Sequence, residues 1–92
     1  MPKRSRMEIY FDVLNVIASG EEKPTRIMYG ANLSWRAIQT MFSNLITQGF
    51  IEEAGCERGK RYHITTKGEN ALHYYLRAVK DITTFEILPD VK

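Results

Sequence analysis

Few residues of this chain have the types and spacing that covalent catalysis or metal binding requires. His63 and His73 are far apart in sequence, with no carboxylate or thiol at ligand spacing, so we expect no metal site. The single cysteine, Cys56, falls in an expected loop that offers neither a fixed base nor oxyanion donors. Residues 55–60 lack the glycine spacing and the Ser or Thr of a phosphate-binding loop. We therefore predict no catalytic residue, no cofactor and no small-molecule ligand, and hence a protein that is not an enzyme.

Polar side chains on one expected helix have, by contrast, the chemistry that reads nucleic-acid bases. The apolar residues of the segment 34–48 repeat at helical spacing and should turn inward: Ile38, Met41, Phe42, Leu45 and Ile46. The opposite face then carries Arg36, Gln39, Thr40, Ser43 and Thr47, with Ser34 and Trp35 at the N-terminal end. Arginine can bond guanine and glutamine can bond adenine bidentately, and serine or threonine can bond bases or phosphates. The pattern predicts a base-reading face, and its alternative is an ordinary solvated helix face.

Cations elsewhere in the chain suit a phosphate backbone, provided that the fold brings them to the same face. This set comprises Arg4, Arg6, Arg26, Arg36, Arg58, Lys60, Arg61 and Lys67. Each charge by itself is ordinary, so only a shared face would make the set informative. The indole of Trp35 either lies against the sugar-phosphate backbone, where its N–H can donate to a phosphate, or packs under the preceding turn.

Local signals place the elements that must position these residues. After a basic arm at residues 1–5, a capping box of Ser5 and Glu8 opens a helix over 6–19, which Gly20 ends. Pro24 suits the first turn of a short helix over 24–30. Ser34 caps a third helix over 34–48, which Gly49 ends, and Phe50 can fold back onto Leu45.

The second half of the chain is predicted to form a hairpin and a long helix. Residues 50–65 are interrupted by a loop with two glycines at 55–59, which is typical of a β-hairpin. On the second strand Tyr62 and Ile64 should point to the core. A second capping box, from Thr66 to Glu69, opens a last helix over 66–88, and Pro89 prevents its continuation.

This order of elements predicts one domain over residues 1–92 of the α+β class, mainly α-helical with a small hairpin. A short helix, a tight turn, an amphipathic helix and a β-hairpin follow one another as in a winged helix-turn-helix. In that fold the third helix enters the major groove of DNA as the recognition helix. The hairpin, or wing, would lie on the DNA backbone or in the minor groove.

Length and composition agree with a small folded domain. The 92 residues are 43% apolar and 26% charged, which is an ordinary balance, and a net charge of +2 by itself argues weakly against a nucleic-acid partner. No window approaches the roughly 18 consecutive apolar residues of a membrane span, and no apolar signal-peptide core follows the N-terminal cations. We expect a cytoplasmic, nucleoid-associated protein without a membrane partner.

Three segments resemble a known family. Residues 25–34 (TRIMYGANLS), 49–51 (GFI) and 62–68 (YHITTKG) are similar to the small archaeal winged-helix DNA-binding proteins, some of which are encoded by archaeal viruses. The first segment is fairly specific to that family, whereas the last occurs in many winged-helix regulators. The resemblance covers nearly the whole chain. It implies a DNA-binding homodimer joined by its long last helices in an antiparallel coiled coil.

The last helix partly fits such a dimer. Leu72, Tyr75, Val79 and Ile82 step by 3, 4 and 3 residues, the spacing of a coiled-coil seam, with Leu76 beside it. Residues 83–85, Thr-Thr-Phe, are poor coiled-coil residues, so the contact is either shorter or uses Phe85, Ile87 and Leu88 across onto the partner's first helix. Burial against the chain's own first helix is the alternative, and it suits Leu72 and Leu76 best.

Three functions follow from this fold, and the sequence favours the first. The first is a homodimeric transcriptional regulator that binds double-stranded DNA sequence-specifically. The second is an architectural chromatin protein that binds DNA with little sequence specificity. The third is a winged-helix module for protein interaction that does not contact DNA.

Overall fold

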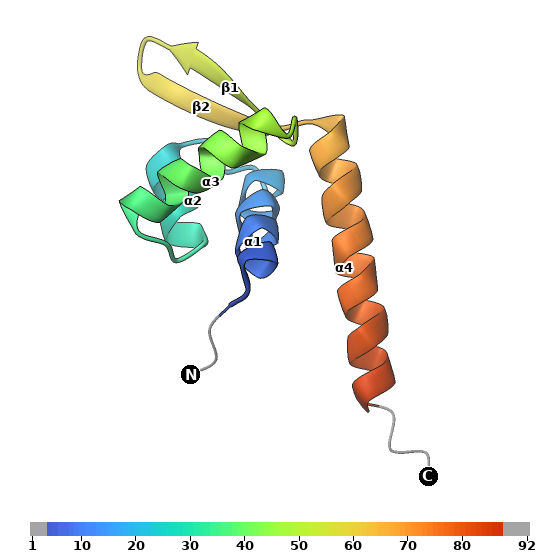
Figure 1. The fold of residues 1–92 in the computed structure, drawn as a ribbon. Helices are drawn as coiled ribbons and strands as arrows, with labels where there is room; N and C mark the ends of the chain where they lie inside the picture. Colours follow the sequence, from blue (N-terminus) through green and yellow to red (C-terminus); the bar gives the residue numbers. More distant parts are fainter. Residues whose placement is uncertain (1–3, 88–92) are drawn as a thin grey trace.

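The computed structural model describes residues 4–87, with all side chains in that range except those of Cys56 and residues 82–87. Its elements, in chain order, are α1 (Arg6–Ala18), α2 (Pro24–Gly30), α3 (Trp35–Thr47), β1 (Ile51–Cys56), β2 (Gly59–Ile64) and α4 (Thr66–Ile87) (Figure 1). This is the predicted order, and the α+β winged-helix fold class is confirmed. The predicted last residue of α4, at position 88, lies outside the described residues.

Helix α1 begins at the predicted capping box. The Ser5 hydroxyl accepts the backbone N–H of Glu8 at 3.1 Å, and the Glu8 carboxylate accepts the backbone N–H of Ser5 at 2.9 Å. These two bonds satisfy N–H groups that have no partner within the helix. The backbone hydrogen bond from Ser5, followed by the one to its side chain, lowers the pKa of Glu8 from its ordinary value of 4.5.

The lowered pKa predicts how α1 responds to acid. Because the folded-state pKa of Glu8 is depressed, its ionised form stabilises the fold above the unfolded-state value near 4.5, and this contribution is lost as pH falls through the folded-state pKa. We expect a Glu8→Gln variant to unfold at a lower temperature than the wild type at neutral pH, and the difference to close in acid. Thermal unfolding followed by circular dichroism between pH 2 and 7 tests this. A difference that does not vary with pH would contradict it.

Helices α2 and α3 both end in a defined backbone motif. At the end of α2, Asn32 adopts the left-handed conformation (φ 57°), and the N–H of Leu33 donates to the carbonyl of Met28 at 3.1 Å. At the end of α3, Gly49 has φ 80° and the N–H of Phe50 donates to the carbonyl of Leu45 at 2.9 Å. Both are Schellman stops, and the one at Gly49 was predicted.

The turn of the hairpin is shorter than the loop predicted between Gly55 and Gly59. The strands pair in antiparallel register from Ile51 opposite Ile64 to Cys56 opposite Gly59, which leaves a turn of only two residues, Glu57 and Arg58. The expected five-residue loop at 55–59 is therefore wrong. Gly59, with φ 112°, closes the chain in the shorter turn.

The start of α4 also differs from the prediction. The cap is Thr65 rather than Thr66: the Thr65 hydroxyl accepts the N–H of Gly68 at 3.0 Å and donates to the carbonyl of Gly49 at 2.6 Å. The capping box of Thr66 with Glu69 is therefore wrong, because the earlier threonine is held in place by the end of α3. One hydroxyl thus joins the end of α3 to the start of α4.

The core lies between the three short helices and the hairpin. Its buried residues are Val13, Leu14, Ile17, Ile27, Ala31, Ile38, Met41, Phe42, Leu45, Ile51, Tyr62 and Leu72. The rings of Phe42 and Tyr62 stack with centroids 4.0 Å apart, so the wing is tied to α3. Ile46, predicted to turn inward, is 37% exposed because it lies at the edge of the apolar stripe. Apart from Tyr62, no residue with a polar or charged side chain is buried in the part of the chain that the structure describes.

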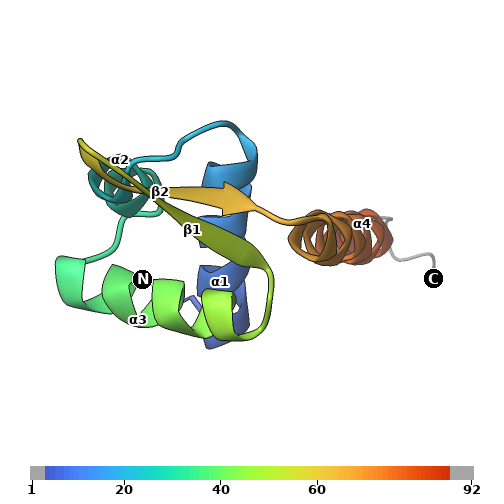
Figure 2. The ribbon, with the colours of Figure 1, turned by 90° about the horizontal axis from the view of Figure 1, so that it is seen from above.

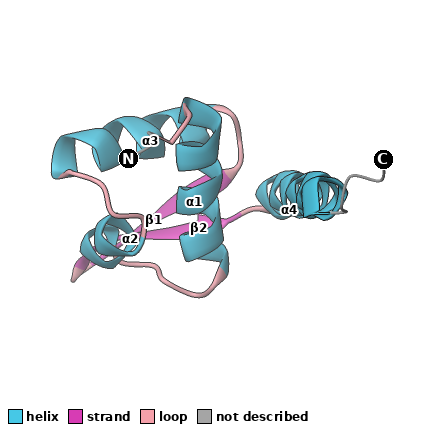
Figure 3. Cartoon of the chain, turned by 90° about the horizontal axis from the view of Figure 1, so that it is seen from below, coloured by secondary structure: helices cyan, strands magenta, loops and turns pink. Residues whose placement is uncertain are grey.

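Helix α4 extends beyond this body on one side (Figures 2 and 3). Its first turns pack through Leu72, which is 6% exposed, and through Tyr75, whose ring stacks on Phe11 with centroids 4.0 Å apart. Farther along, Leu76 and Val79 are 46% and 40% exposed. The molecule consequently measures 60 × 30 × 20 Å. None of the described helices has the length and apolar character needed to cross a membrane.

Candidate nucleic-acid interface

The outer face of α3 carries the predicted base-reading side chains. Arg36, Gln39, Thr40 and Ser43 are all exposed, on the opposite side of the helix from its buried residues. Thr40 donates to the carbonyl of Arg36 at 3.3 Å. Within residues 4–87, Arg36, Gln39 and Ser43 form no side-chain hydrogen bond or ion pair, so their donors and acceptors are available to a ligand.

The N-terminal end of α3 presents one cap and one aromatic ring. The Ser34 hydroxyl accepts the N–H of Ala37 at 3.1 Å, so Ser34 is first of all the N-cap of the helix. Trp35 is 51% exposed, so its indole is accessible. This exposure disfavours the alternative in which Trp35 packs under the preceding turn. Tyr29 on α2 is 76% exposed and was not singled out from the sequence. Its position two residues after the buried Ile27 was the available signal, since that spacing places it on the outer face.

The elements that carry several of the cations lie on the side away from α4. In two perpendicular views the hairpin tip, α2 and the start of α3 lie at one side of the molecule and α4 at the other (Figures 1 and 2). Arg58 is in the two-residue turn of the hairpin, Arg26 is in α2 and Arg36 is in the first turn of α3. The side chains of these three arginines, and those of Arg6 and Arg61, have no hydrogen-bond or ion-pair partner among the described residues.

Three cations of the predicted set, Lys60, Lys67 and Arg4, have side-chain partners inside the protein. Lys60 pairs with the carboxylate of Glu53 at 3.2 Å, which raises the pKa of Lys60 and offsets its charge locally. The Lys67 ammonium donates to the carbonyl of Gln48 at 2.8 Å and lies 5.2 Å from the centroid of the Phe50 ring.

Arg4 is the most fully occupied cation of the predicted set. Its guanidinium pairs with Asp12 at 2.7 Å and donates to the carbonyls of Ala31 at 2.9 Å and Asn32 at 3.2 Å. These contacts could not be predicted from the sequence, because the two carbonyl partners are distant along the chain.

The residues predicted for a dimer contact divide into two groups. Leu72 and Tyr75 are used inside the domain, the first in the core and the second against Phe11. Leu76 and Val79 are exposed and remain available. The side chains of Ile82 and Phe85 lie outside the described part of the structure.

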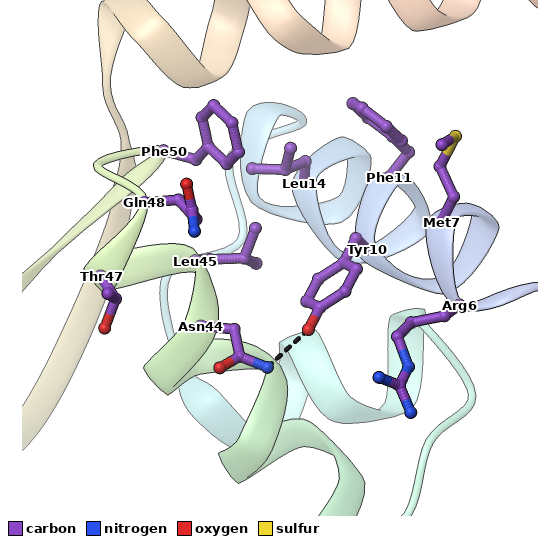
Figure 4. Close-up of a pocket in the computed structure, with 10 residues that line it drawn as sticks. All are labelled: Arg6, Met7, Tyr10, Phe11, Leu14, Asn44, Leu45, Thr47, Gln48 and Phe50. Atoms are coloured by element: carbon purple, nitrogen blue, oxygen red, sulfur yellow. Dashed lines mark hydrogen bonds between the residues drawn. The ribbon is translucent and has the colours of Figure 1, made fainter.

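A groove of about 450 Å³ opens between α1 and the C-terminal end of α3 (Figure 4). Its walls are largely apolar, and the residues that line it are Arg6, Met7, Tyr10, Phe11, Leu14, Asn44, Leu45, Thr47, Gln48 and Phe50. Across it, the Asn44 amide donates to the hydroxyl of Tyr10 and ties α3 to α1. No cluster of three or more potential metal ligands occurs among the described residues.

Relatives in sequence come from an archaeon. The chain is 47% identical over 51 residues to the uncharacterized protein MJ0287 of Methanocaldococcus jannaschii, a match that covers 55% of this chain and 53% of that protein. A second protein of this organism, MJ0290, is 34% identical over 67 residues, which are 73% of this chain and 30% of that protein. The chain therefore spans about half the length of the first relative and less than a third of the second.

Solved structures share the fold. Sso10a-2, a DNA-binding protein from Sulfolobus solfataricus, is 24% identical, with a TM-score of 0.71 and 90% of each chain covered. The sequence of this chain matches the winged helix-turn-helix family model over residues 3–84, nearly its whole length. The matched family is described as a winged helix-turn-helix and Sso10a-2 as a DNA-binding protein, and neither description names an enzymatic activity. The match and the geometry together identify the chain as a member of the winged helix-turn-helix family.

Proposed function

We propose that this protein is a homodimeric, sequence-specific DNA-binding transcriptional regulator. In this proposal α3 lies in the major groove and the hairpin lies on the backbone or in the minor groove. The observation that carries it is the outer face of α3, where Arg36, Gln39 and Ser43 are exposed without internal partners. Bidentate contacts to guanine and adenine require arginine and glutamine side chains whose donors and acceptors are not already bonded within the protein. A helix face that only contacts solvent has no such requirement.

The cations and the relatives support the same proposal. Arg26, Arg36 and Arg58 belong to elements on one side of the molecule, where they can neutralise phosphates on both sides of a groove. Trp35 adds an exposed indole at the start of α3, within the same surface. Sso10a-2, which has the same fold, is a DNA-binding protein. Association with the nucleoid follows from DNA binding.

The homodimer is the second part of the proposal. Leu76 and Val79 continue the apolar stripe of α4 beyond the point at which α1 covers it. Burying this stripe against a second copy removes apolar surface from water in both chains. Two-fold symmetry then predicts a roughly palindromic DNA site, with half-sites about one helical turn or a multiple of it apart.

Selection of bound duplexes from a random pool at physiological salt tests the proposal. Enrichment of one sequence over random duplex by roughly 10³-fold or more is the expected result. Nearly equal and strongly salt-dependent affinities for all duplexes would instead identify an architectural protein. Absence of binding would identify a protein-interaction module.

The variant Arg36→Ala tests the role of α3 in this binding. We expect it to cost about 1–3 kcal/mol of binding free energy at one base position, because a bidentate arginine contact discriminates by that amount. Binding of the selected duplex and of its single-base variants, measured by fluorescence anisotropy, gives the value. Arg77→Ala on α4 is the matched control and should bind like the wild type. Equal losses on all sequences would make Arg36 a phosphate contact instead.

A further inference from the structure

We propose that Arg4 and Lys67 are positioning residues that hold the two ends of α3, and not phosphate contacts. This inference rests on the proposed function, since it concerns how the base-reading helix is oriented. Both residues were expected from the sequence to contact DNA. Their side chains are instead bonded to backbone carbonyls at the turn that precedes α3 and at the turn that ends it.

Arg4 fixes the turn between α2 and α3. Its Nη1 donates both to Asp12 of α1 and to the carbonyl of Ala31, and its Nη2 donates to the carbonyl of Asn32. Ala31 is 2% exposed, so its carbonyl has little access to water. Asn32 has a left-handed backbone. The guanidinium therefore holds the strained residue of the turn against α1, through three bonds that its planar fork makes together.

Lys67 holds the other end of α3 from the first turn of α4. Its ammonium donates to the carbonyl of Gln48, the C-cap residue of α3. The last carbonyls of a helix have no partner within it and carry partial negative charge, so a cation there is favourable. The same ammonium lies 5.2 Å from the centroid of the Phe50 ring, within cation–π distance. The Thr65 hydroxyl on Gly49 adds a second bond at the same junction.

Positioning and phosphate contact differ in what they change. A phosphate contact contributes charge, so its loss lowers the salt dependence of DNA binding by about 0.9 in log–log slope and affects all sequences alike. A positioning residue contributes geometry. Base-edge hydrogen bonds weaken steeply with distance and angle, so a tilted α3 loses sequence discrimination while the number of phosphate contacts stays the same.

The variant Arg4→Lys separates these roles because it keeps the charge and loses the fork. We expect its preference for the selected duplex over a random duplex to fall about tenfold, the order of a lost charge-assisted hydrogen bond, with an unchanged salt slope. Arg4→Gln and Lys67→Gln should also lose preference without losing slope. The matched control is Arg6→Gln, which removes an unpartnered cation two residues away and should keep the preference for the selected duplex.

Two outcomes would overturn the inference. One is an Arg4→Lys variant with wild-type preference, combined with an Arg4→Gln variant of lower salt slope, since Arg4 would then be a phosphate contact. The other is unchanged hydrogen exchange in Arg4→Lys, without DNA, at the amides of Asn32 and Leu33 that close the end of α2. We expect faster exchange at both amides. If the wild type binds no duplex, the proposed function fails. The hydrogen-exchange measurement still tests whether Arg4 holds the turn before α3.

Discussion

Replacing Gly68 by alanine is expected to lower the free energy of unfolding by about 3 kcal/mol, the upper part of the range for overpacking a buried site. A Cβ at this position would lie 2.1 Å from the carbonyl oxygen of Phe50 and 2.8 Å from a side-chain carbon of Ile64. The nearer atom belongs to the backbone that accepts the N–H of Thr65 at 3.0 Å, so it cannot move without breaking the junction before α4. For a domain of this size the thermal midpoint should fall by roughly 12–24 °C.

Gly55→Ala is the matched control for this prediction. It makes the same chemical change in β1, where the added Cβ meets no atom within 4 Å and the backbone does not have a positive φ. Its stability should stay near that of the wild type, since alanine is no worse than glycine in a strand. Thermal and urea unfolding of both variants give the comparison. Equal midpoints for Gly68→Ala and Gly55→Ala would show that α4 does not approach Phe50 so closely.

Replacing Val79 by glutamate is expected to convert the proposed dimer into monomers of 10.7 kDa. Val79 is 40% exposed and lies with Leu76 on the continuation of the stripe that Leu72 begins in the core. An unpaired carboxylate in an apolar contact costs several kcal/mol, and two-fold symmetry introduces it twice. The dimer should therefore weaken by roughly 10²-fold or more. Light scattering over a range of protein concentrations measures the change in mass.

Tyr74→Glu is the control for the dimer contact. Tyr74 is 72% exposed, and its place five residues earlier puts it about 140° around the helix from Val79. The same acid on that face should leave the dimer mass unchanged. If Val79→Glu keeps the wild-type mass, the stripe is not the interface. If only Tyr74→Glu dissociates, the opposite face of α4 forms the contact.

The features that local sequence determines were predicted well. The capping box of Ser5 and Glu8 involves residues three positions apart, and the stop at Gly49 needs only the left-handed conformation of one residue. The exposed face of α3 follows from the periodicity of Ile38, Met41, Phe42 and Leu45, which is a property of a single helix. Local bonding and periodicity therefore fixed the order of the elements and the side chains that α3 presents.

The features that depend on distant contacts were not predictable. Thr65 caps α4 in place of Thr66 because its hydroxyl bonds to Gly49, which is 16 residues away. Arg4 bonds to carbonyls 27 and 28 residues away, so only its positive charge near a helix could be recognised beforehand. Spacing allowed both Leu72 and Leu76 to be buried against α1 or to lie in a dimer seam, and the tertiary fold buries only Leu72 and leaves Leu76 46% exposed. In each case two partners were chemically reasonable for the residue, and packing between elements determined which of them it contacts.

The junction at Thr65 links the length of α4 to the spacing of the DNA half-sites in the proposed dimer. The Thr65 hydroxyl joins the end of α3 to the start of α4, so in that dimer the orientation of α3 would be coupled to the orientation of α4. The separation of the two recognition helices is then set by how many residues of α4 lie between this junction and the two-fold axis, at about 1.5 Å each. In the proposed dimer the length of α4 would thus set the spacing of the half-sites. A variant of this chain with a longer or shorter α4 would then bind half-sites at a different separation, while α3 contacts the same bases.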